Sequence, residues 1–109
     1  MKMLTRSEEM LLLAVWRLQE EAYGVTIQEK LEEVSGKSTS FGALFVSLDR
    51  LVRKGHLQSY FSESLPMRGG KKRRMYRLTK KGSVALCEIR KVERAIWQGI
   101  SETALASIS

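Results

Sequence analysis

The side chains with the clearest chemical potential in this sequence are basic, and they gather in one central stretch. Residues 37–81 hold twelve Lys/Arg and two Asp/Glu, a net charge of +10, whereas residues 1–36 carry −3 and residues 82–109 carry 0. The densest part, residues 66–74, contains no carboxylate. Neutralising several backbone phosphates releases condensed counterions, so this cluster predicts a polyanionic partner, with DNA or RNA as the first candidate.

A basic run also occurs in solvated loops, on anionic membranes and in targeting signals. A membrane-surface role would need an amphipathic helix, and the Gly69-Gly70 pair disfavours a helix in this run. The longest apolar run, residues 10–16, is too short to span a bilayer, and the N-terminus lacks a secretory pattern. We therefore expect a cytoplasmic protein with no membrane partner.

The sequence offers no constellation for catalysis or metal binding. One Cys and one His cannot form an internal disulfide or a metal site. There is no nucleophile with a plausible base and no phosphate-cradling glycine loop, so we expect no enzyme, no catalytic residues, no metal and no cofactor. The adjacent carboxylate pairs splay apart on a helix, and we interpret them as solvated faces: Glu8-Glu9, Glu20-Glu21 and Glu32-Glu33.

Two single residues receive structural interpretations. Cys87 is expected to be a small buried hydrophobe, because a redox sensor would need an electropositive, partly exposed thiol. His56 follows Gly55, a natural helix stop, and is expected to be structural.

Helical patterns fill the first half of the chain, whose 109 residues and 43% apolar content suit one compact domain. Thr5 and Glu8 have capping-box spacing before an apolar run that predicts a core helix through Leu18. A short amphipathic helix follows, with its apolar positions at helical spacing before the stop at Gly36: Ile27, Leu31 and Val34.

A third helix is predicted after the possible N-caps at residues 38–40, and Gly55 ends it. Its apolar positions are Phe41, Leu44, Phe45, Leu48, Leu51 and Val52. The opposite face carries small side chains near its start and basic ones near its end, which is typical of a surface that can enter a groove: Ser40, Ala43, Ser47, Arg50 and Lys54.

A β-hairpin and a last helix complete the pattern. Residues 57–61 and 75–78 read as strands, joined by a long connection that holds Pro66, Gly69 and Gly70. Thr79 can cap a final helix whose apolar stripe is Ala85, Ile89, Val92, Ile96 and Ile100, with Trp97 beside it.

The order helix, helix, helix, strand, strand, helix predicts a mainly α fold with a small β-hairpin: a winged helix-turn-helix followed by a C-terminal dimerisation helix. We divide the chain into a DNA-binding domain at residues 1–81 and a dimerisation helix at residues 82–109. In such a module the third helix enters the major groove and the hairpin, or wing, reaches neighbouring phosphates.

The sequence resembles the PadR-type transcriptional regulators from about Leu4 to Trp97. The resemblance rests on an ordered set of short matches: Leu4-Thr5, Tyr23-Gly24, Gly42-Ala43-Leu44-Phe45 followed by Leu48, Leu51 and Gly55, and Lys72-Arg73 leading to Tyr76-Arg77-Leu78-Thr79-x-x-Gly82. It implies a homodimeric bacterial repressor. Where the family commonly shows Leu-Tyr-Pro, this chain has Leu44-Phe45-Val46, so any contact of that Tyr hydroxyl would be missing, and Phe45 is interpreted as core.

The predicted contacts with double-stranded DNA fall into three groups. Phosphate contacts are expected from the wing, at Arg68, Lys71, Lys72, Arg73 and Arg74. The start of the third helix can hold a phosphate or simply be capped, at Lys37, Ser38, Thr39 and Ser40. Base edges are expected near Ser40, Ala43, Ser47 and Arg50, and Arg50 can alternatively pair with Asp49 or the DNA backbone.

The last helix is expected to form a homodimer through Ile89, Val92, Ile96 and Ile100, because two apolar helices exceed what so small a domain can bury. Trp97 is a candidate contact for a small aromatic effector, and Trp16 a weaker one, since it continues a buried run. The same stripe could instead cover the protein's own first helix.

A different class of function remains open from the residues alone. The winged helix can serve as a protein-interaction or accessory module whose wing meets an acidic partner. Single-stranded RNA fits less well, because the aromatics that could stack bases lie on short strands that must also build the core.

Overall fold

A computed structural model describes residues 2–62 and 72–108. Its elements are α1 (Arg6–Leu18), the 3-10 turn η1 (Gln19–Glu21), α2 (Gly24–Ser35), α3 (Phe41–Arg53), β1 (Leu57–Phe61), β2 (Arg74–Leu78), α4 (Lys80–Trp97) and α5 (Glu102–Ala106). The predicted order from the first helix to the fourth is confirmed, and α5 was not predicted. No helix in residues 2–62 and 72–108 is both long and apolar enough to cross a membrane.

The predicted capping box begins α1. The backbone N–H of Glu8 donates to Thr5 Oγ1 at 3.1 Å, and the Thr5 N–H donates back to Glu8 Oε1 at 2.9 Å. This reciprocal pair satisfies donors that a helix start otherwise leaves open. Gly36 ends α2 with φ at 72°, a conformation that glycine adopts without strain.

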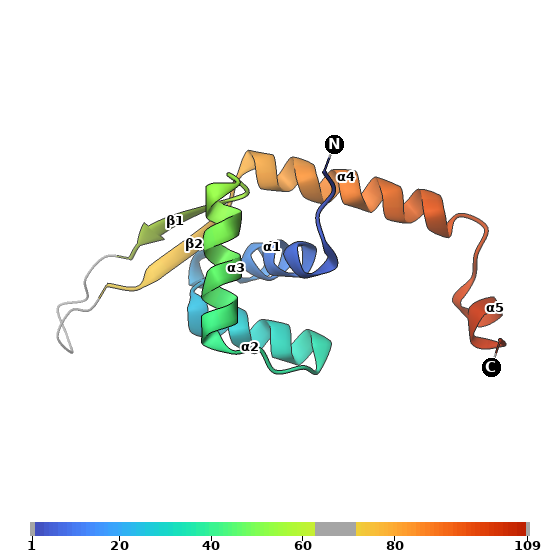
Figure 1. The fold of residues 1–109 in the computed structure, drawn as a ribbon, viewed down its shortest axis with the longest axis horizontal. Coiled ribbons are helices and arrows are strands. Elements are labelled where there is room, and N and C mark those ends of the chain that lie inside the picture. Colours follow the sequence, from blue (N-terminus) through green and yellow to red (C-terminus); the bar gives the residue numbers. More distant parts are fainter. Residues whose placement is uncertain (1, 63–71, 109) are drawn as a thin grey trace.

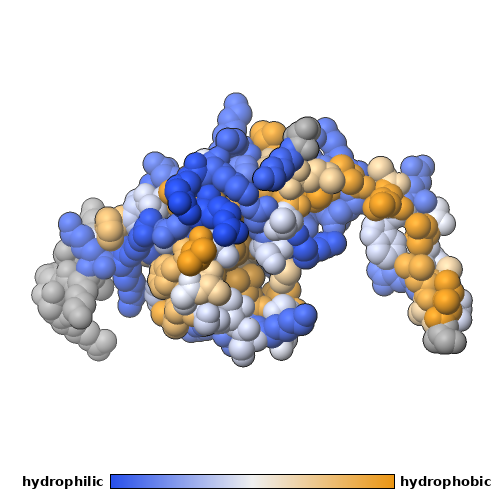
Figure 2. Space-filling view, in the orientation of Figure 1, coloured by the Kyte–Doolittle hydropathy of each residue, from blue (hydrophilic) through white to orange (hydrophobic). Residues whose placement is uncertain are grey.

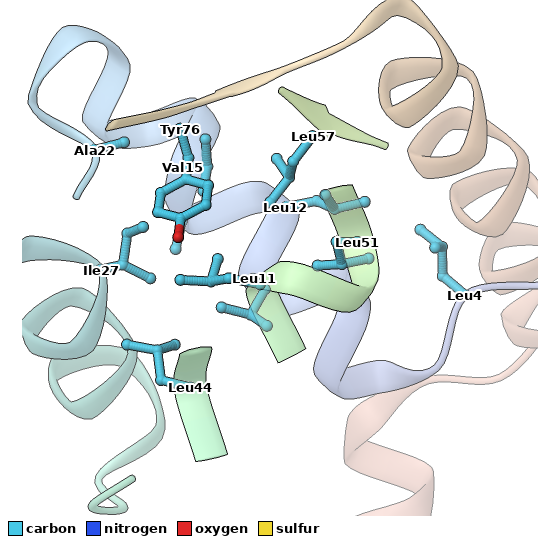
Figure 3. Close-up of a cluster of buried hydrophobic side chains, with 12 residues drawn as sticks. Leu4, Leu11, Leu12, Val15, Ala22, Ile27, Leu44, Leu51, Leu57 and Tyr76 are labelled. Atoms are coloured by element: carbon cyan, nitrogen blue, oxygen red, sulfur yellow. The ribbon is translucent and has the colours of Figure 1, made fainter. Parts of the chain in front are cut away.

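Helices α1, α2 and α3 enclose one core, which the hairpin closes from the side (Figure 1). The fully buried side chains include Leu12 and Val15 of α1, Ile27 of α2 and Leu48 of α3. Figure 3 shows the Tyr76 ring of β2 pointing into this cluster near Val15 and Ile27. Helices and hairpin therefore share one hydrophobic centre, which fixes the hairpin relative to α3.

The expectation that α1 is buried nearly all round is wrong on one side. Leu13 and Trp16 are exposed, with 57% of Trp16 accessible. Since α2 and α3 cover one face of α1 and α4 crosses the opposite face only in part, Leu13 and Trp16 are left to solvent. Trp16 therefore does not continue a buried run.

The antiparallel hairpin pairs Leu57 with Leu78 at its base and Phe61 with Arg74 at its outer end. Beyond Phe61, the Ser62 N–H donates to the Arg73 carbonyl at 2.8 Å, so the ladder continues to the edge of the described residues. The Tyr76 N–H donates to the Ala22 carbonyl at 2.9 Å, which ties β2 to the turn after α1. Burial of its phenol raises the pKa of Tyr76.

Thr79 caps α4 as predicted, accepting from the Gly82 N–H at 3.0 Å and donating to the Gly55 carbonyl at 2.6 Å. The first half of α4 packs on the core through its half-buried apolar residues, and the second half extends away from it (Figure 1). The helix ends at Trp97, and Gly99 turns the chain with φ at 80°. Ile100 therefore lies beyond the helix, and the predicted stripe is wrong at that position.

Two further interpretations from the sequence are wrong. Glu9 is 8% exposed rather than solvated, because α4 lies across that side of α1 and brings Glu93 and Arg6 around it. Cys87 is exposed, because it lies on the side of α4 that faces away from the core. Neither the burial of Glu9 nor the exposure of Cys87 could be predicted from neighbouring residues in the sequence.

Candidate nucleic-acid interface

The exposed side of α3 and the hairpin lie next to each other and are joined directly. The Arg74 guanidinium of β2 lies 3.3 Å from the Asp49 carboxylate of α3. In Figure 1 the hairpin leaves α3 near its C-terminal end and points away from the core. Figure 2 shows hydrophilic residues over the hairpin and the upper half of α3 in the same view. The two predicted contact elements thus form one continuous surface.

The start of α3 is held by hydrogen bonds within the protein. Ser40 Oγ accepts from the Ala43 N–H at 3.2 Å, and the Thr39 carbonyl accepts from the Gln28 side chain. The Lys37 N–H donates to Ser35 Oγ at 3.1 Å, while Ser38 is exposed. The alternative of simple capping is therefore what Ser40 does here, and a phosphate contact at this end stays a prediction.

Along α3, the buried residues Leu44, Leu48 and Leu51 fix which side faces outward. Ala43 and Arg50 are exposed on that side and Ser47 is half-buried. These are the side chains predicted to approach base edges, and the structure presents them together. Because Asp49 pairs with Arg74, the alternative that Arg50 pairs with Asp49 is not what the structure shows.

Phe45 is not a core residue, contrary to the expectation. It is 40% exposed, and its ring stacks on Phe41 with centroids 6.1 Å apart. The ring also covers the start of α2, where a Cβ on Gly24 would lie 3.1 Å from Phe45 Cζ. The two rings pack at the junction of α2 and α3 and stay partly exposed, since helix packing covers only their inner side.

The arginines of the wing rest on tyrosine rings. Their guanidinium carbons lie 4.3 to 5.5 Å from the ring centroids, in the pairs Arg73 on Tyr23, Arg74 on Tyr76 and Arg77 on Tyr60. Such stacking restricts a guanidinium while leaving its N–H groups free to donate. Lys72 is exposed. Arg68 and Lys71 lie outside the described residues.

Lys54 has a protein partner that the sequence did not indicate. Its Nζ donates to Glu8 Oε2 at 2.6 Å. Partial burial acts to raise the pKa of Glu8, but the hydrogen bonds from Lys54 and Thr5 outweigh it and leave that pKa below its usual value. Lys54 therefore joins α3 to α1, and we leave it out of the contacts proposed below.

The residues predicted for a dimer and an effector divide along α4. Ile89 is half-buried against the core, whereas Val92, Ile96 and Trp97 are exposed toward the free end of α4. Ile100 is exposed in the segment after it. Trp16 borders a hollow at the opposite end of α4, beside Leu78, Lys80 and Ser83. Within one chain, the two tryptophans therefore do not line a common site.

The pattern of the sequence gave no sign of two features of this surface. Asp49 fixes the wing to α3, although it stands alone as a carboxylate among basic residues. Tyr23 stacks with Arg73, which is far from it in the sequence, and Tyr60 stacks with Arg77 on the facing strand. On β2, Arg74 and Tyr76 are two residues apart and so share one face of the strand, which is the one signal in the sequence for such stacking.

Comparison with known proteins agrees with this geometry. The profile of the Transcriptional regulator PadR-like family matches residues 12–88. A PadR-like transcription factor from Bacteroides fragilis is 31% identical, with 92% of this chain and 87% of that chain covered and a TM-score of 0.65. A PadR family regulator from Clostridium difficile R20291 is 27% identical, with 90% and 97% covered and a TM-score of 0.62.

A PadR-like transcriptional regulator from Bacillus cereus is 25% identical, with 94% and 91% of the chains covered and a TM-score of 0.68. No curated protein matches the chain. The family profile covers well over half of the sequence, and the fold, the wing and the exposed third helix agree with it. The chain belongs to the PadR-like family of transcriptional regulators and is a regulator with a winged-helix fold rather than an enzyme.

Proposed function

We propose that this regulator binds double-stranded DNA sequence-specifically as a homodimer and represses transcription from a pseudo-palindromic operator. The observation that carries the proposal is that the basic segment of the sequence coincides with the two elements that a winged helix places on DNA, the third helix and the wing. Residues 37–81 carry a net charge of +10, the described part of this segment forms α3, the hairpin and the start of α4, and the Asp49–Arg74 ion pair joins α3 to the hairpin on one surface. A helix that presents small side chains beside a basic wing suits a major groove with flanking phosphates.

Within this surface the residues take different roles. Arg50 is the candidate for a bidentate contact with guanine, and Ala43 and Ser47 let the helix approach the base edges. Phosphates are met by the wing, through Arg68, Lys71, Lys72, Arg73 and Arg74, and by the start of α3 at Lys37, Ser38, Thr39 and Ser40. The residues of the wing set affinity and salt dependence, and Arg50 sets preference among sequences.

The distal half of α4 supports the homodimer. Its exposed Val92, Ile96 and Trp97, with Ile100 beyond, form an apolar strip that projects from the folded core (Figure 2). A second copy related by a two-fold axis would cover this strip, and the operator half-sites read by the two α3 helices would then have centres about 34 Å apart, one turn of DNA. Residues 1–81 then serve as the DNA-binding unit, residues 82–109 as the dimerising segment, and the cytoplasm as the place of action.

The test is selection of bound fragments from the source genome, followed by fluorescence anisotropy on a recovered duplex and on a scrambled one. We expect a two-fold symmetric motif and a Kd at least about 10³-fold lower for it than for the scrambled duplex. Equal affinity for both duplexes would rule out sequence-specific regulation. Transcription from a promoter carrying the motif, with and without the protein, then separates repression from activation.

We also propose that a planar aromatic effector binds near Trp97 in the dimer. The support is the exposure of this indole on the apolar strip of α4. Titration of planar aromatic compounds should quench tryptophan fluorescence and release DNA. The Trp97→Ala variant, which keeps Trp16, should lose most of the quenching, and quenching of unchanged size in that variant would place the effector elsewhere.

A further inference from the structure

A second basic surface lies where the N-terminal segment meets the C-terminal half of α3. It is a hollow of about 780 Å³, bounded by residues 2–5 and the start of α1 on one side, by α3 on another and by the first turn of α4. We call it the N-terminal hollow. Glu8 is the one carboxylate among its lining residues, and its cations are Lys2, Arg50, Arg53, Lys54 and Lys81.

Most of this positive charge is uncompensated. The Lys54–Glu8 pair neutralises one cation and the carboxylate together. In residues 2–62 and 72–108 the other four cations form no ion pair: Lys2, Arg50, Arg53 and Lys81. Four like charges around one concavity repel one another and raise the local concentration of anions. The hollow therefore suits a ligand that carries several negative charges.

The hollow is continuous with the exposed side of α3. Ser47 and Arg50 belong both to that side and to the lining of the hollow. In Figure 1 the hairpin leaves α3 on one side and the N-terminal segment runs on the other. A duplex lying along α3 would thus meet basic residues on both flanks of this helix.

Two features favour a polyanion over a small free phosphate. At the start of α1 the capping box already engages the Glu8 N–H, and the Glu8 carboxylate that accepts from Thr5 places a negative charge where a small phosphate would have to sit. Lys2, Arg53 and Lys81 are exposed at the rim, on long side chains that can follow an extended backbone. Leu4, which is 8% exposed, anchors the N-terminal segment to the core and keeps Lys2 at this rim.

We propose that the N-terminal hollow receives the DNA phosphate backbone on the flank of α3 opposite the wing, through Lys2, Arg53 and Lys81, while Arg50 stays available for the base contact proposed above. This inference rests on the DNA-binding function proposed above. Backbone contacts on both flanks fix the register of α3 in the groove, and these three residues all lie outside the contacts that the sequence indicated.

The hollow contains its own reporter. His56, the single histidine of the chain, lines it, and its Nδ1 is buried without a partner in the described residues. Burial lowers the pKa of His56, and the positive charge of Lys81 lowers it further. A phosphate seated in the hollow opposes the effect of Lys81 and raises that pKa, which NMR of the one imidazole can follow.

The test measures how the affinity for the selected operator depends on salt. In Lys2→Gln, Arg53→Gln and Lys81→Gln, each lost phosphate contact should reduce the slope of log K against log [salt] by about 0.9. Lys91→Gln on the distal half of α4 is the matched control and should leave the slope unchanged. Operator binding should also raise the pKa of His56 in the wild-type protein.

Each outcome decides between explanations. If Lys72→Gln lowers the slope and the three variants do not, the inference fails while the proposed function stands. If the wild-type protein binds no duplex, both fail. If inorganic phosphate alone shifts the His56 resonance saturably and the three variants keep the wild-type slope with DNA, the hollow is a free-anion site instead, and the inference is wrong. Because the three side chains are exposed, the variants should fold, which thermal melts can verify.

Discussion

At the scale of single residues, the most unusual feature outside the surface proposed for DNA is a pair of carboxyl groups between α1 and α4. Glu9 is buried beside Glu93, and the Arg6 guanidinium lies 3.1 Å from a carboxylate oxygen of each. Burial raises the pKa of Glu9, and the hydrogen bond with Glu93 and the negative charge of Glu93 raise it further. The pair is therefore more stable with one proton bound than with both carboxyl groups ionised.

Glu9 makes stability depend on pH in a defined direction, whereas the pKa of Glu93 is lowered by its contacts with Glu9 and Arg6 and acts in the opposite sense. The pKa of Glu9 in the folded state lies above its usual value of 4.5. Its contribution to stability is therefore complete below that value and is lost as the pH rises through the folded pKa. Glu9→Gln, which resembles the protonated acid, should melt at a higher temperature than the wild type at pH 7, and the difference should vanish near pH 4.

Differential scanning calorimetry at both pH values checks this expectation. Glu29→Gln on the exposed side of α2 is the control and should leave the pH dependence as it is in the wild type. A Glu9→Gln variant that is less stable than the wild type at pH 7 would mean that the charged form of Glu9 supports the fold.

At the scale of elements, the junction between the hairpin and α4 has the least room. A Cβ on Gly82 would lie 2.3 Å from the His56 carbonyl oxygen and 2.7 Å from Leu78 Cδ1. The backbone of α4 thus touches the turn after α3 directly, and Thr79 bonds to the same turn. Glycine is required here for close approach between two elements.

Gly82→Ala should destabilise the protein by about 3 kcal/mol, because the clash is with backbone and cannot be relieved by a side-chain rotation. Gly42→Ala is the matched control. A Cβ at Gly42 meets no described atom within 4 Å, and its position in α3 favours alanine by up to about 1 kcal/mol. Urea denaturation should therefore shift in opposite directions for the two variants. A neutral Gly82→Ala would show that α4 can tilt freely at this junction.

The sequence predicted elements well where the signal was local. Thr5 and Thr79 cap the helices that they were expected to begin, and Ser40, one of the three candidate caps of α3, caps that helix. Gly36 ends α2 as expected. The prediction failed where the outcome depended on distant packing. Glu9, Trp16 and Cys87 took environments set by which faces α2, α3 and α4 cover, and no neighbour in the sequence records that choice.

The surface proposed for DNA shows the same division. The sequence predicted basic residues on α3 and the wing because the apolar spacing of residues 41–52 indicates a helix and the runs at residues 57–61 and 75–78 indicate strands. It could not show that Asp49 ties the wing to α3 or that Glu8 holds Lys54, since each pair joins separate elements. Lys2 and Lys81 are far apart in the chain and line the same hollow only because the N-terminal segment and α4 both border α3.

At the scale of the whole molecule, the single chain is extended. Its dimensions are 57 × 30 × 21 Å and its radius of gyration is 16.7 Å, whereas a compact domain of this length has about 13 Å. The expectation of one compact domain is thus wrong for the C-terminal part, because the distal half of α4 and α5 project from the core (Figure 1). An apolar projection of this kind is typical of a surface that a partner covers.

Ile96, which is 70% exposed, is the position where this can be tested. Ile96→Asp should convert the proposed dimer into a monomer at micromolar concentration, because a charge would be buried in an apolar contact. Analytical ultracentrifugation gives the mass directly. Val25→Asp places the same change on α2, on a side chain that is 44% exposed, and should leave the mass unaltered. Identical masses for wild type and Ile96→Asp would remove α4 from the subunit contact.

The tight seat of α4 at Gly82 has a mechanical consequence. The helix has 18 residues, but its first half rests on the core, so only about its last eight residues project, a length of about 12 Å at a rise of 1.5 Å per residue. A bend of about 10° where the helix leaves the core would move its tip by about 2 Å over such a length. In the proposed two-fold assembly, the distance between the two α3 helices would then depend on how far the distal half of α4 bends, because the close contact at Gly82 holds the base of this helix in place.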